Sequence, residues 1–147
     1  LAAGERVLVG TPDYVACRPP VQVPEDLLQG HNCLTYRKAQ EPTSWRYLQD
    51  VQVQELKING TLHSNNGEVL RRAALSALGL ALLAVWSVPE DLQAGRLLRL
   101  LPQYRLTNST FDNGVYALFR HTHMLPQRVR VFVDYLAETL AAPESAE

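Results

Sequence analysis

The stretch from Asn65 to Val85, NNGEVLRRAALSALGLALLAV, places a capped helix directly before an apolar strand. Asn65 can cap this helix, and Glu68 three residues later completes a capping box. Gly79 stands where a helix commonly ends on a left-handed residue. The apolar side chains between these ends recur at helical spacing, at Val69, Leu70, Ala73, Ala74, Ala77 and Leu78. Leu80 to Val85 is then apolar throughout, as in a strand whose two faces are both buried.

Strands and short helices also alternate on either side of this stretch. Before it, we expect strands over 6–10 and 33–36, short helices beginning at Pro12 and Pro24, and extended chain over 45–62. Within the extended chain, Asn59-Gly60 is either a hairpin turn or a kink in one strand. After it, we expect a short helix from Pro89 that stops at Gly95, strands over 97–101 and 114–119, and a last helix from Pro126. This order predicts an α/β fold with a mixed sheet flanked by helices.

The composition excludes several classes of protein. The chain has 147 residues, 46% of them hydrophobic, which suffices for a globular core and argues against disorder. A net charge of −1 provides no basic surface for phosphates, so nucleic acid is not expected as a direct partner. The longest uncharged stretch, Ala73 to Pro89, is shorter than the ~20 apolar residues that a membrane span needs. Two cysteines without C-x-x-C spacing predict a reducing, cytoplasmic compartment.

Signals for catalysis and for metal binding are weak. The chain contains no G-x-S-x-G, Walker, G-x-G-x-x-G or H-E-x-x-H motif, so no catalytic residue, cofactor or enzyme activity is predicted. His121 and His123 could share a metal, but no third ligand stands at a recognisable spacing. Cys17 and Cys33 could form a redox pair, but both adjoin apolar residues, and burial as small core residues is the better interpretation.

One segment has the chemistry of a binding site. His63, Ser64, Asn65 and Asn66 lead from a predicted strand into the helix described above. The first N–H groups of a helix have no acceptor within it, so such a start attracts a small anion such as a carboxylate. The alternative is that Ser64 and Asn65 only cap the helix, and composition alone favours that alternative.

The order of these segments resembles the effector-binding domain of LysR-type transcriptional regulators. The resemblance covers roughly residues 6–140. Each segment alone is a loose match to the family, whereas the whole set in this order is fairly specific for it. The matching segments are Val7 to Ala16, Pro24 to Leu27, His31 to Leu34, Asn65 to Gly67, Ala73 to Leu75, Leu78 to Ala81, Trp86, Asp91 to Leu97, Leu100 to Tyr104, Leu125-Pro126, Val129-Arg130 and Phe132 to Leu136.

The resemblance implies a periplasmic-binding-protein-like (type 2) fold and a division of the chain. Family members carry a winged helix-turn-helix and then two α/β subdomains that bind an inducer in the cleft between them. Residues 1–11 would be a strand of the first subdomain, 12–113 the second subdomain, and 114–147 the returning strand and C-terminal helix of the first. The first subdomain would then be incomplete and the chain a fragment. Thr11 matches the small hydroxyl residue before the family's crossover proline, and we expect it beside His63, Ser64, Asn65 and Asn66, although it could simply cap the following helix.

These observations predict a cytoplasmic ligand-sensing domain without catalysis. Its partner would be a small-molecule effector, and DNA would be bound only through the absent helix-turn-helix. Two alternatives stay open: a solute-binding protein of similar fold, and a thiol sensor that uses Cys17 and Cys33. We also expect a dimer or a swapped dimer, because the last helix presents an apolar stripe whose usual sheet is largely absent. That stripe consists of Val129, Phe132, Val133, Leu136 and Leu140.

Overall fold

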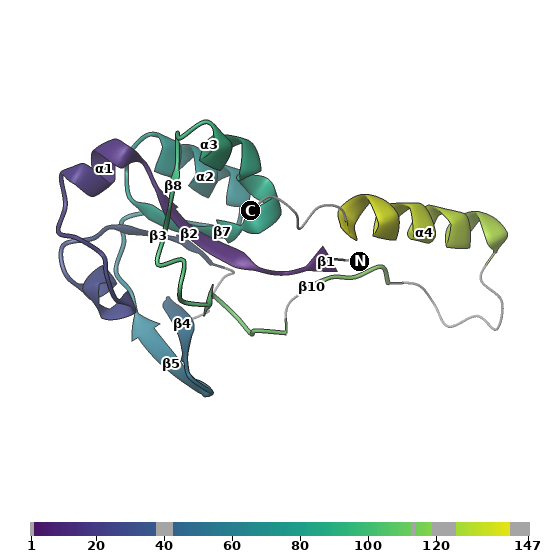
Figure 1. The fold of residues 1–147 in the computed structure, drawn as a ribbon, viewed down its shortest axis with the longest axis horizontal. Coiled ribbons are helices and arrows are strands. Elements are labelled where there is room, and N and C mark those ends of the chain that lie inside the picture. The colour runs from purple at the N-terminus through teal and green to yellow at the C-terminus, as the bar shows by residue number, and fades with distance from the viewer. Residues whose placement is uncertain (1, 38–42, 113, 119–125, 142–147) are drawn as a thin grey trace. The chain divides into compact units, whose positions relative to one another are not determined.

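The chain forms two compact units (Figure 1). The computed structural model describes residues 2–37, 43–112, 114–118 and 126–141. The larger unit is the continuous segment Glu5–Phe111, and the smaller unit joins Leu1–Gly4 to Asp112–Glu147. Residues 6–10, which the resemblance assigns to the first subdomain, pair with strands of the larger unit.

A mixed five-stranded sheet forms the centre of the larger unit, as predicted. Its order is β6-β3-β7-β2-β8, in which β3 runs parallel to β6 and β7 while β2 is antiparallel to β7 and β8. The strands are β2 (Arg6–Gly10), β3 (Cys33–Tyr36), β6 (His63–Ser64), β7 (Leu80–Ala84) and β8 (Leu98–Leu100). The last two are shorter than expected, because Val85 begins a short 3-10 turn and Leu101 has a φ of 50°.

A second, antiparallel sheet has the order β5-β4-β9. It consists of β4 (Ser44–Gln49), β5 (Gln52–Lys57) and β9 (Leu106–Thr107), and the β4–β5 turn places Asp50 at a φ of 56°. The chain makes no hairpin at Asn59-Gly60. Instead it runs beside β3, where the carbonyl of Asn59 accepts from the N–H of Cys33 at 3.1 Å. This dipeptide lies between β5 and β6, which belong to different sheets, so both the hairpin and the kink within one strand are wrong.

Both faces of the five-stranded sheet are covered (Figure 1). The helices α2 (Gly67–Leu75) and α3 (Pro89–Gln93) lie on one side, where Leu70 and Ala74 are fully buried. The sheet with β4 and β5 lies on the other side and contributes Trp45, Tyr47 and Leu56 to the core. Period-two alternation therefore sends Val7 and Val9 toward the helices and Leu8 toward the second sheet.

Short helices begin at prolines as the sequence predicts. They are α1 (Pro12–Ala16), the 3-10 helix η1 (Pro24–Leu28) and α3, and a further 3-10 turn, η2, covers Val85–Ser87. The predicted role of Gly79 is wrong, because the left-handed residue after α2 is Ala77, with a φ of 58°. Gly79 is instead a point of close approach, where an added Cβ would lie 2.2 Å from the backbone oxygen of Asn32.

The smaller unit contains two short strands and the last helix. β1 (Ala2–Ala3) pairs antiparallel with β10 (Gly114–Val115), which is shorter than the strand expected over 114–119. α4 (Gln127–Ala141) follows Pro126. Its predicted stripe is only partly covered, since Val129, Val133 and Leu136 are half-buried and Phe132 and Leu140 are exposed. In the described part of the chain, no helix has the length and apolar character to cross a bilayer.

A buried carboxylate joins the two helices that cover the sheet. Asp91 of α3 is 1% exposed and accepts from Arg71 of α2 at 2.7 Å and from Arg96 at 2.8 Å. Its carbonyl also accepts from the N–H groups of Arg96 and Leu97. Burial raises the pKa of Asp91, but the hydrogen bonds from Arg96 and Arg71 outweigh it, so the pKa lies below its ordinary value.

The two cysteines lie in different environments. Cys33 of β3 is fully buried in the core, and burial raises the pKa of its thiol to about 12. Cys17, just after α1, is exposed. The prediction of burial is therefore confirmed for Cys33 and wrong for Cys17. Because the thiolate is the reactive form, Cys33 is a poor partner for a redox pair in the native fold.

Replacing Asp91 with asparagine should lower the free energy of unfolding by about 2–4 kcal/mol, since two arginines lose their shared buried carboxylate. Urea unfolding followed by circular dichroism measures this change. Glu5→Gln is the control, because it breaks an exposed pair with Arg99 at 3.4 Å that is worth less than about 1 kcal/mol.

The Asp91 effect should also depend on pH in a defined direction. Because the folded pKa is depressed, the stabilisation is complete well above the unfolded value near 3.8 and is lost as the pH falls through the folded pKa. The stabilities of wild type and Asp91→Asn should therefore converge in strong acid. Equal urea midpoints at neutral pH would contradict the assigned role.

Iodoacetamide should modify Cys17 in the native protein and Cys33 only after unfolding, because only the first thiol is accessible. Mass spectrometry of the labelled peptides distinguishes the two sites. Mild peroxide should leave no Cys17–Cys33 disulfide in the folded chain. Formation of that disulfide without unfolding would favour the thiol sensor.

Candidate functional site

Four elements meet at one edge of the five-stranded sheet. The parallel strands β3, β6 and β7 end there, and the antiparallel strand β2 begins there. In the register, Tyr36 pairs with Ser64 and Arg6 pairs with Ala84. The α2 helix starts from this edge, because Ser64 is separated from Gly67 by two residues only. The segment predicted to bind a ligand therefore lies at the carboxyl ends of parallel strands, where ligands of open α/β sheets commonly bind.

The side chains of this segment hold the start of α2. The Oγ of Ser64 accepts from the N–H of Asn66 at 3.1 Å, and the Oδ1 of Asn66 accepts from the N–H of Glu68 at 2.9 Å. The N-cap is thus Asn66, one residue later than predicted. Glu68 makes no capping box, because its carboxylate instead accepts from Arg71 and Arg72. The side-chain amide of Asn66 therefore occupies the N-cap position that was predicted for Asn65, and Asn65 itself is exposed.

The helix start faces open space. Helical geometry leaves the N–H groups of Gly67 and Val69 without an acceptor inside the helix. A Cβ added at Gly67 would meet no atom within 4 Å, and Asn65, Asn66 and Gly67 are all exposed. The positive end of the helix dipole and these free N–H groups favour an anion at this position.

His63 is anchored to the neighbouring strand. Its Nδ1 forms a hydrogen bond with the hydroxyl of Thr35, the residue that it pairs with in the sheet. Thr35 is buried, whereas His63 is exposed. The contact therefore holds one ring nitrogen of an otherwise exposed side chain.

Thr11 does not lie beside the other four residues, so that part of the prediction is wrong. Because β2 is antiparallel to β7, its carboxyl end points to the opposite edge of the sheet. Following the register from His63 across β3 and β7 leads to Leu8 of β2, and Thr11 comes three residues after Leu8. Three strand spacings and three residues together separate Thr11 from His63 by about 15–20 Å. Its Oγ1 accepts from the N–H of Tyr14 at 3.2 Å and caps α1.

Two residues at the edge were overlooked in the sequence. Arg6, the first residue of β2, places its guanidinium carbon 6.0 Å from the ring centroid of Tyr36, and both side chains are half-buried. The signal that could have identified Arg6 is a cation at the start of a strand that is otherwise apolar, Val7-Leu8-Val9. Tyr36 follows the apolar strand of residues 33–35 and carries no distinguishing signal of its own.

Metal ligands do not cluster in the part of the chain that the structure describes. Within residues 2–37, 43–112, 114–118 and 126–141, no three His, Cys, Asp or Glu side chains come close enough to share an ion. His121 and His123 lie outside the described residues.

Comparison with known proteins identifies relatives among transcriptional regulators. The transcriptional regulator PtxR of Pseudomonas aeruginosa is 34% identical over 140 residues, which are 92% of this chain and 42% of PtxR. The regulator CrgA of Neisseria meningitidis is 32% identical over 133 residues, 90% of this chain and 43% of CrgA. The chain therefore spans about two-fifths of the length of the curated relatives that it matches.

Solved structures share the fold. The regulatory domain of AphB from Vibrio vulnificus superimposes with a TM-score of 0.69 at 24% identity, covering 95% of this chain and 66% of that domain. The regulatory domain of CrgA gives a TM-score of 0.67 at 24% identity and covers 96% and 66%. Both are LysR-type regulatory domains, whose fold is the periplasmic-binding-protein-like type 2 fold.

The family model for the LysR substrate binding domain matches residues 1–141 of the 147-residue chain. Because this match covers nearly the whole chain and the relatives are LysR-type regulators, the chain belongs to the LysR substrate-binding family and is a LysR-type effector-binding domain.

Proposed function

We propose that the chain senses a small anionic effector, such as a carboxylate, as part of a longer LysR-type regulator that binds DNA through a separate helix-turn-helix. The observation that carries this proposal is the open start of α2 at the edge of the sheet, where Gly67 faces free space. Ser64, Asn66 and the free N–H groups are this unit's share of the effector site. Asn65 and His63 border it, and Thr11 belongs to the opposite edge.

The mechanism that fits such a site is a shift of population. An effector that binds one conformation of the domain more tightly favours that conformation by the difference in binding free energy. The bias reaches the DNA-binding domain because both are parts of one protein, and the effector and DNA affinities are then linked reciprocally. No bond is made or broken in the effector, so the site requires recognition and not catalysis.

Other functions have less support. An exported solute-binding protein shares the fold, but the matched relatives are named as regulators of transcription. A thiol sensor would need a reactive Cys33, whose pKa burial raises to about 12. A regulator that acts on DNA works in the cytoplasm, which is the compartment we infer here.

The two units correspond in this proposal to parts of the two family subdomains. The larger unit, Glu5–Phe111, takes the place predicted for residues 12–113 as the second subdomain. The strand and helix of residues 114–147 belong with β1 to the first subdomain. This assignment keeps the predicted order and moves only the position at which the chain enters the second subdomain.

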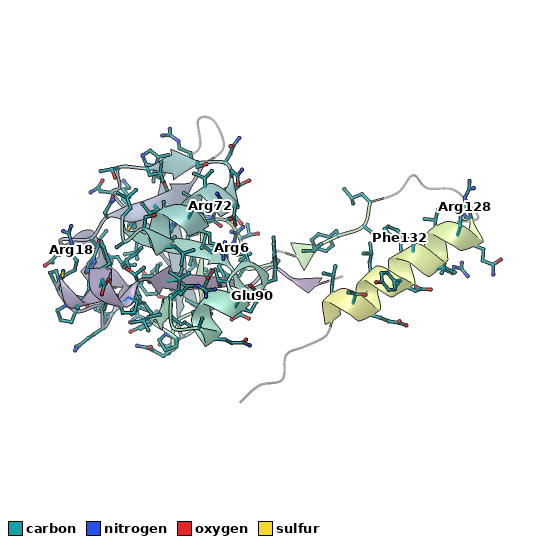
Figure 2. All side chains as sticks on the ribbon, turned by 90° about the horizontal axis from the view of Figure 1, so that it is seen from above. Arg6, Arg18, Arg72, Glu90, Arg128 and Phe132 are labelled. Atoms are coloured by element: carbon teal, nitrogen blue, oxygen red, sulfur yellow. The ribbon has the colours of Figure 1, made fainter. Side chains whose placement is uncertain are left out.

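We further infer that α4 contributes to pairing of two copies. Phe132 and Tyr135 are 59% and 61% exposed, and Figure 2 shows Phe132 on the flank of this helix. Val131 and Leu140 add further exposed apolar surface on α4. Apolar patches of this kind commonly mark a protein interface.

Asn66→Asp should separate effector binding from helix capping. The aspartate keeps the cap and favours the helix dipole, so the melting temperature should stay equal or rise. The new charge should repel an anionic effector and weaken the response of the intact regulator by at least about tenfold. Reporter expression and effector titration measure the response, with DNA binding as the test of integrity.

Ser64→Ala and Asn66→Ala should weaken the response by about 1–3 kcal/mol while DNA binding is retained. Thr11→Ser is the matched control, because it keeps the cap of α1 at the opposite edge and should leave the response unchanged. If Ser64→Ala, Asn66→Ala and Asn66→Asp all respond to the effector as the wild type does, the side chains of Ser64 and Asn66 only cap the helix and do not bind the effector.

Phe132→Glu should weaken self-association at least tenfold, since a buried phenylalanine contributes about 1.5–3 kcal/mol. Sedimentation velocity over a range of concentrations gives the association constant. Val51→Glu is the control, because Val51 is 93% exposed in the β4–β5 turn of the other unit. A wild type that stays monomeric at high concentration would rule out the interface.

A further inference from the structure

Arg6 is half-buried, and within the part of the chain that the structure describes its guanidinium contacts an aromatic ring and forms no ion pair. Its carbon lies 6.0 Å from the ring centroid of Tyr36. Among the described residues, no carboxylate lies within ion-pair distance of Arg6, and no acceptor takes a hydrogen bond from its guanidinium. The neighbouring acid, Glu5, is paired instead with Arg99. A planar group with five N–H donors is thus held at the edge of the sheet with its donors unused.

Other partly covered arginines of this unit have acceptors. Arg71 meets the buried carboxylate of Asp91, and half-buried Arg46 donates to the carbonyl of Ser109 at 2.7 Å. Burial lowers the pKa of Arg6, with an opposing contribution from Tyr36, yet an arginine stays charged at any physiological pH. A desolvated charge without an acceptor is costly, and an anionic ligand would offset that cost.

The position of Arg6 joins it to the site proposed above. Tyr36, whose ring lies under the guanidinium, pairs in the sheet with Ser64, three residues before the first residue of α2. Ala84, which pairs with Arg6, precedes Trp86 by two residues, and Trp86 is 65% exposed. The cation of β2, the aromatic ring of β3 and the open start of α2 therefore come to one edge from three different elements.

We propose that Arg6 binds the anionic group of the effector, so that Arg6 and Tyr36 form a subsite that selects carboxylates or phosphates over uncharged molecules of the same shape. The inference rests on the proposed function and adds to it the residue that supplies the opposite charge. The planar guanidinium can donate two parallel hydrogen bonds to one carboxylate or phosphate, and stacking on the Tyr36 ring fixes the orientation of its plane.

The chain contains a matched control for Arg6. Arg18 also stacks on a tyrosine, with its guanidinium carbon 5.3 Å from the ring centroid of Tyr14. It is exposed, donates to the carbonyl of Gly30, and lies with α1 at the other edge of the sheet. Figure 2 shows Arg6 and Arg18 toward opposite ends of the larger unit. The two pairs therefore differ in burial, hydrogen bonding and place.

The test is a titration of the labelled 147-residue chain by nuclear magnetic resonance at constant ionic strength. The probes are acetate, benzoate and inorganic phosphate, with acetamide and benzamide as uncharged counterparts, each raised to high millimolar concentration. The Nε–H signal of Arg6 and the indole signal of Trp86 should shift and saturate with at least one anion and not with the amides. The Nε–H signal of Arg18 should show no saturable shift with any probe.

Variants then assign the effect to the charge and shape of Arg6. Arg6→Gln should weaken the anion-dependent shift of the Trp86 indole at least about tenfold, as expected when a charged hydrogen bond is lost. Arg6→Lys should keep part of the affinity, because it retains the charge and loses the fork. Arg18→Gln should bind anions as the wild type does. Melting temperatures of all variants identify any that fail to fold. If Arg6→Gln does not fold, Arg6→Lys still tests the contribution of the guanidinium fork.

The outcomes separate this inference from the proposed function. If no anion gives a saturable shift at Arg6, or if anions and amides act alike, the subsite is wrong, and the effect of Ser64 and Asn66 on the intact regulator still decides the proposed function. If Arg6 binds anions but the substitutions at Ser64 and Asn66 leave the response unchanged, the anion subsite stands and the proposed effector site fails.

Discussion

The antiparallel pairing of β2 with β7 determines which residues of the larger unit come to the candidate site. β2 is the strand that brings the chain into the sheet, and it occupies a position between β7 and β8. Because it runs against β3, β6 and β7, its first residue meets their carboxyl ends and its last residue meets their amino ends. This direction brings Arg6 to the candidate site and takes Thr11 away from it. It also buries Val7, Leu8 and Val9 on alternate faces and so links the two cores of the unit.

Most elements were predictable because their signals are local. Prolines at the first helical position marked α1, η1 and α3, and apolar runs marked β2, β3 and β7. The errors arose where the outcome depends on partners distant in the sequence. Gly79 looks like a helix end, but its small size is required by the backbone of Asn32, more than forty residues away. The direction of β2 relative to β7 has no periodicity of its own, so the place of Thr11 could not be predicted.

The candidate site was predicted in part for the same reason. The helix start at residues 63–66 has a local signature in polar caps, but the choice of Asn65 over Asn66 and the capping box with Glu68 were wrong. Arg6 and Tyr36 belong to separate strands and carry no shared motif, so their contact emerges only from the sheet. Among the described residues of the larger unit, buried or half-buried charged side chains have two kinds of environment. Asp91 is fully enclosed and satisfied by two arginines, which stabilises the packing of α2 and α3, whereas the donors of Arg6 stay available at the surface.

The division of the chain has a consequence for synthesis on the ribosome. The larger unit is one uninterrupted segment, Glu5–Phe111, whereas the smaller unit joins the two ends of the chain. Chains emerge from the amino end, and compact units tend to fold as they become complete. The larger unit can therefore close around its sheet while α4 is still inside the exit tunnel, and β1 must wait for β10 before it finds its partner. Throughout that interval Ala2 and Ala3 lack the strand with which they pair in the finished fold.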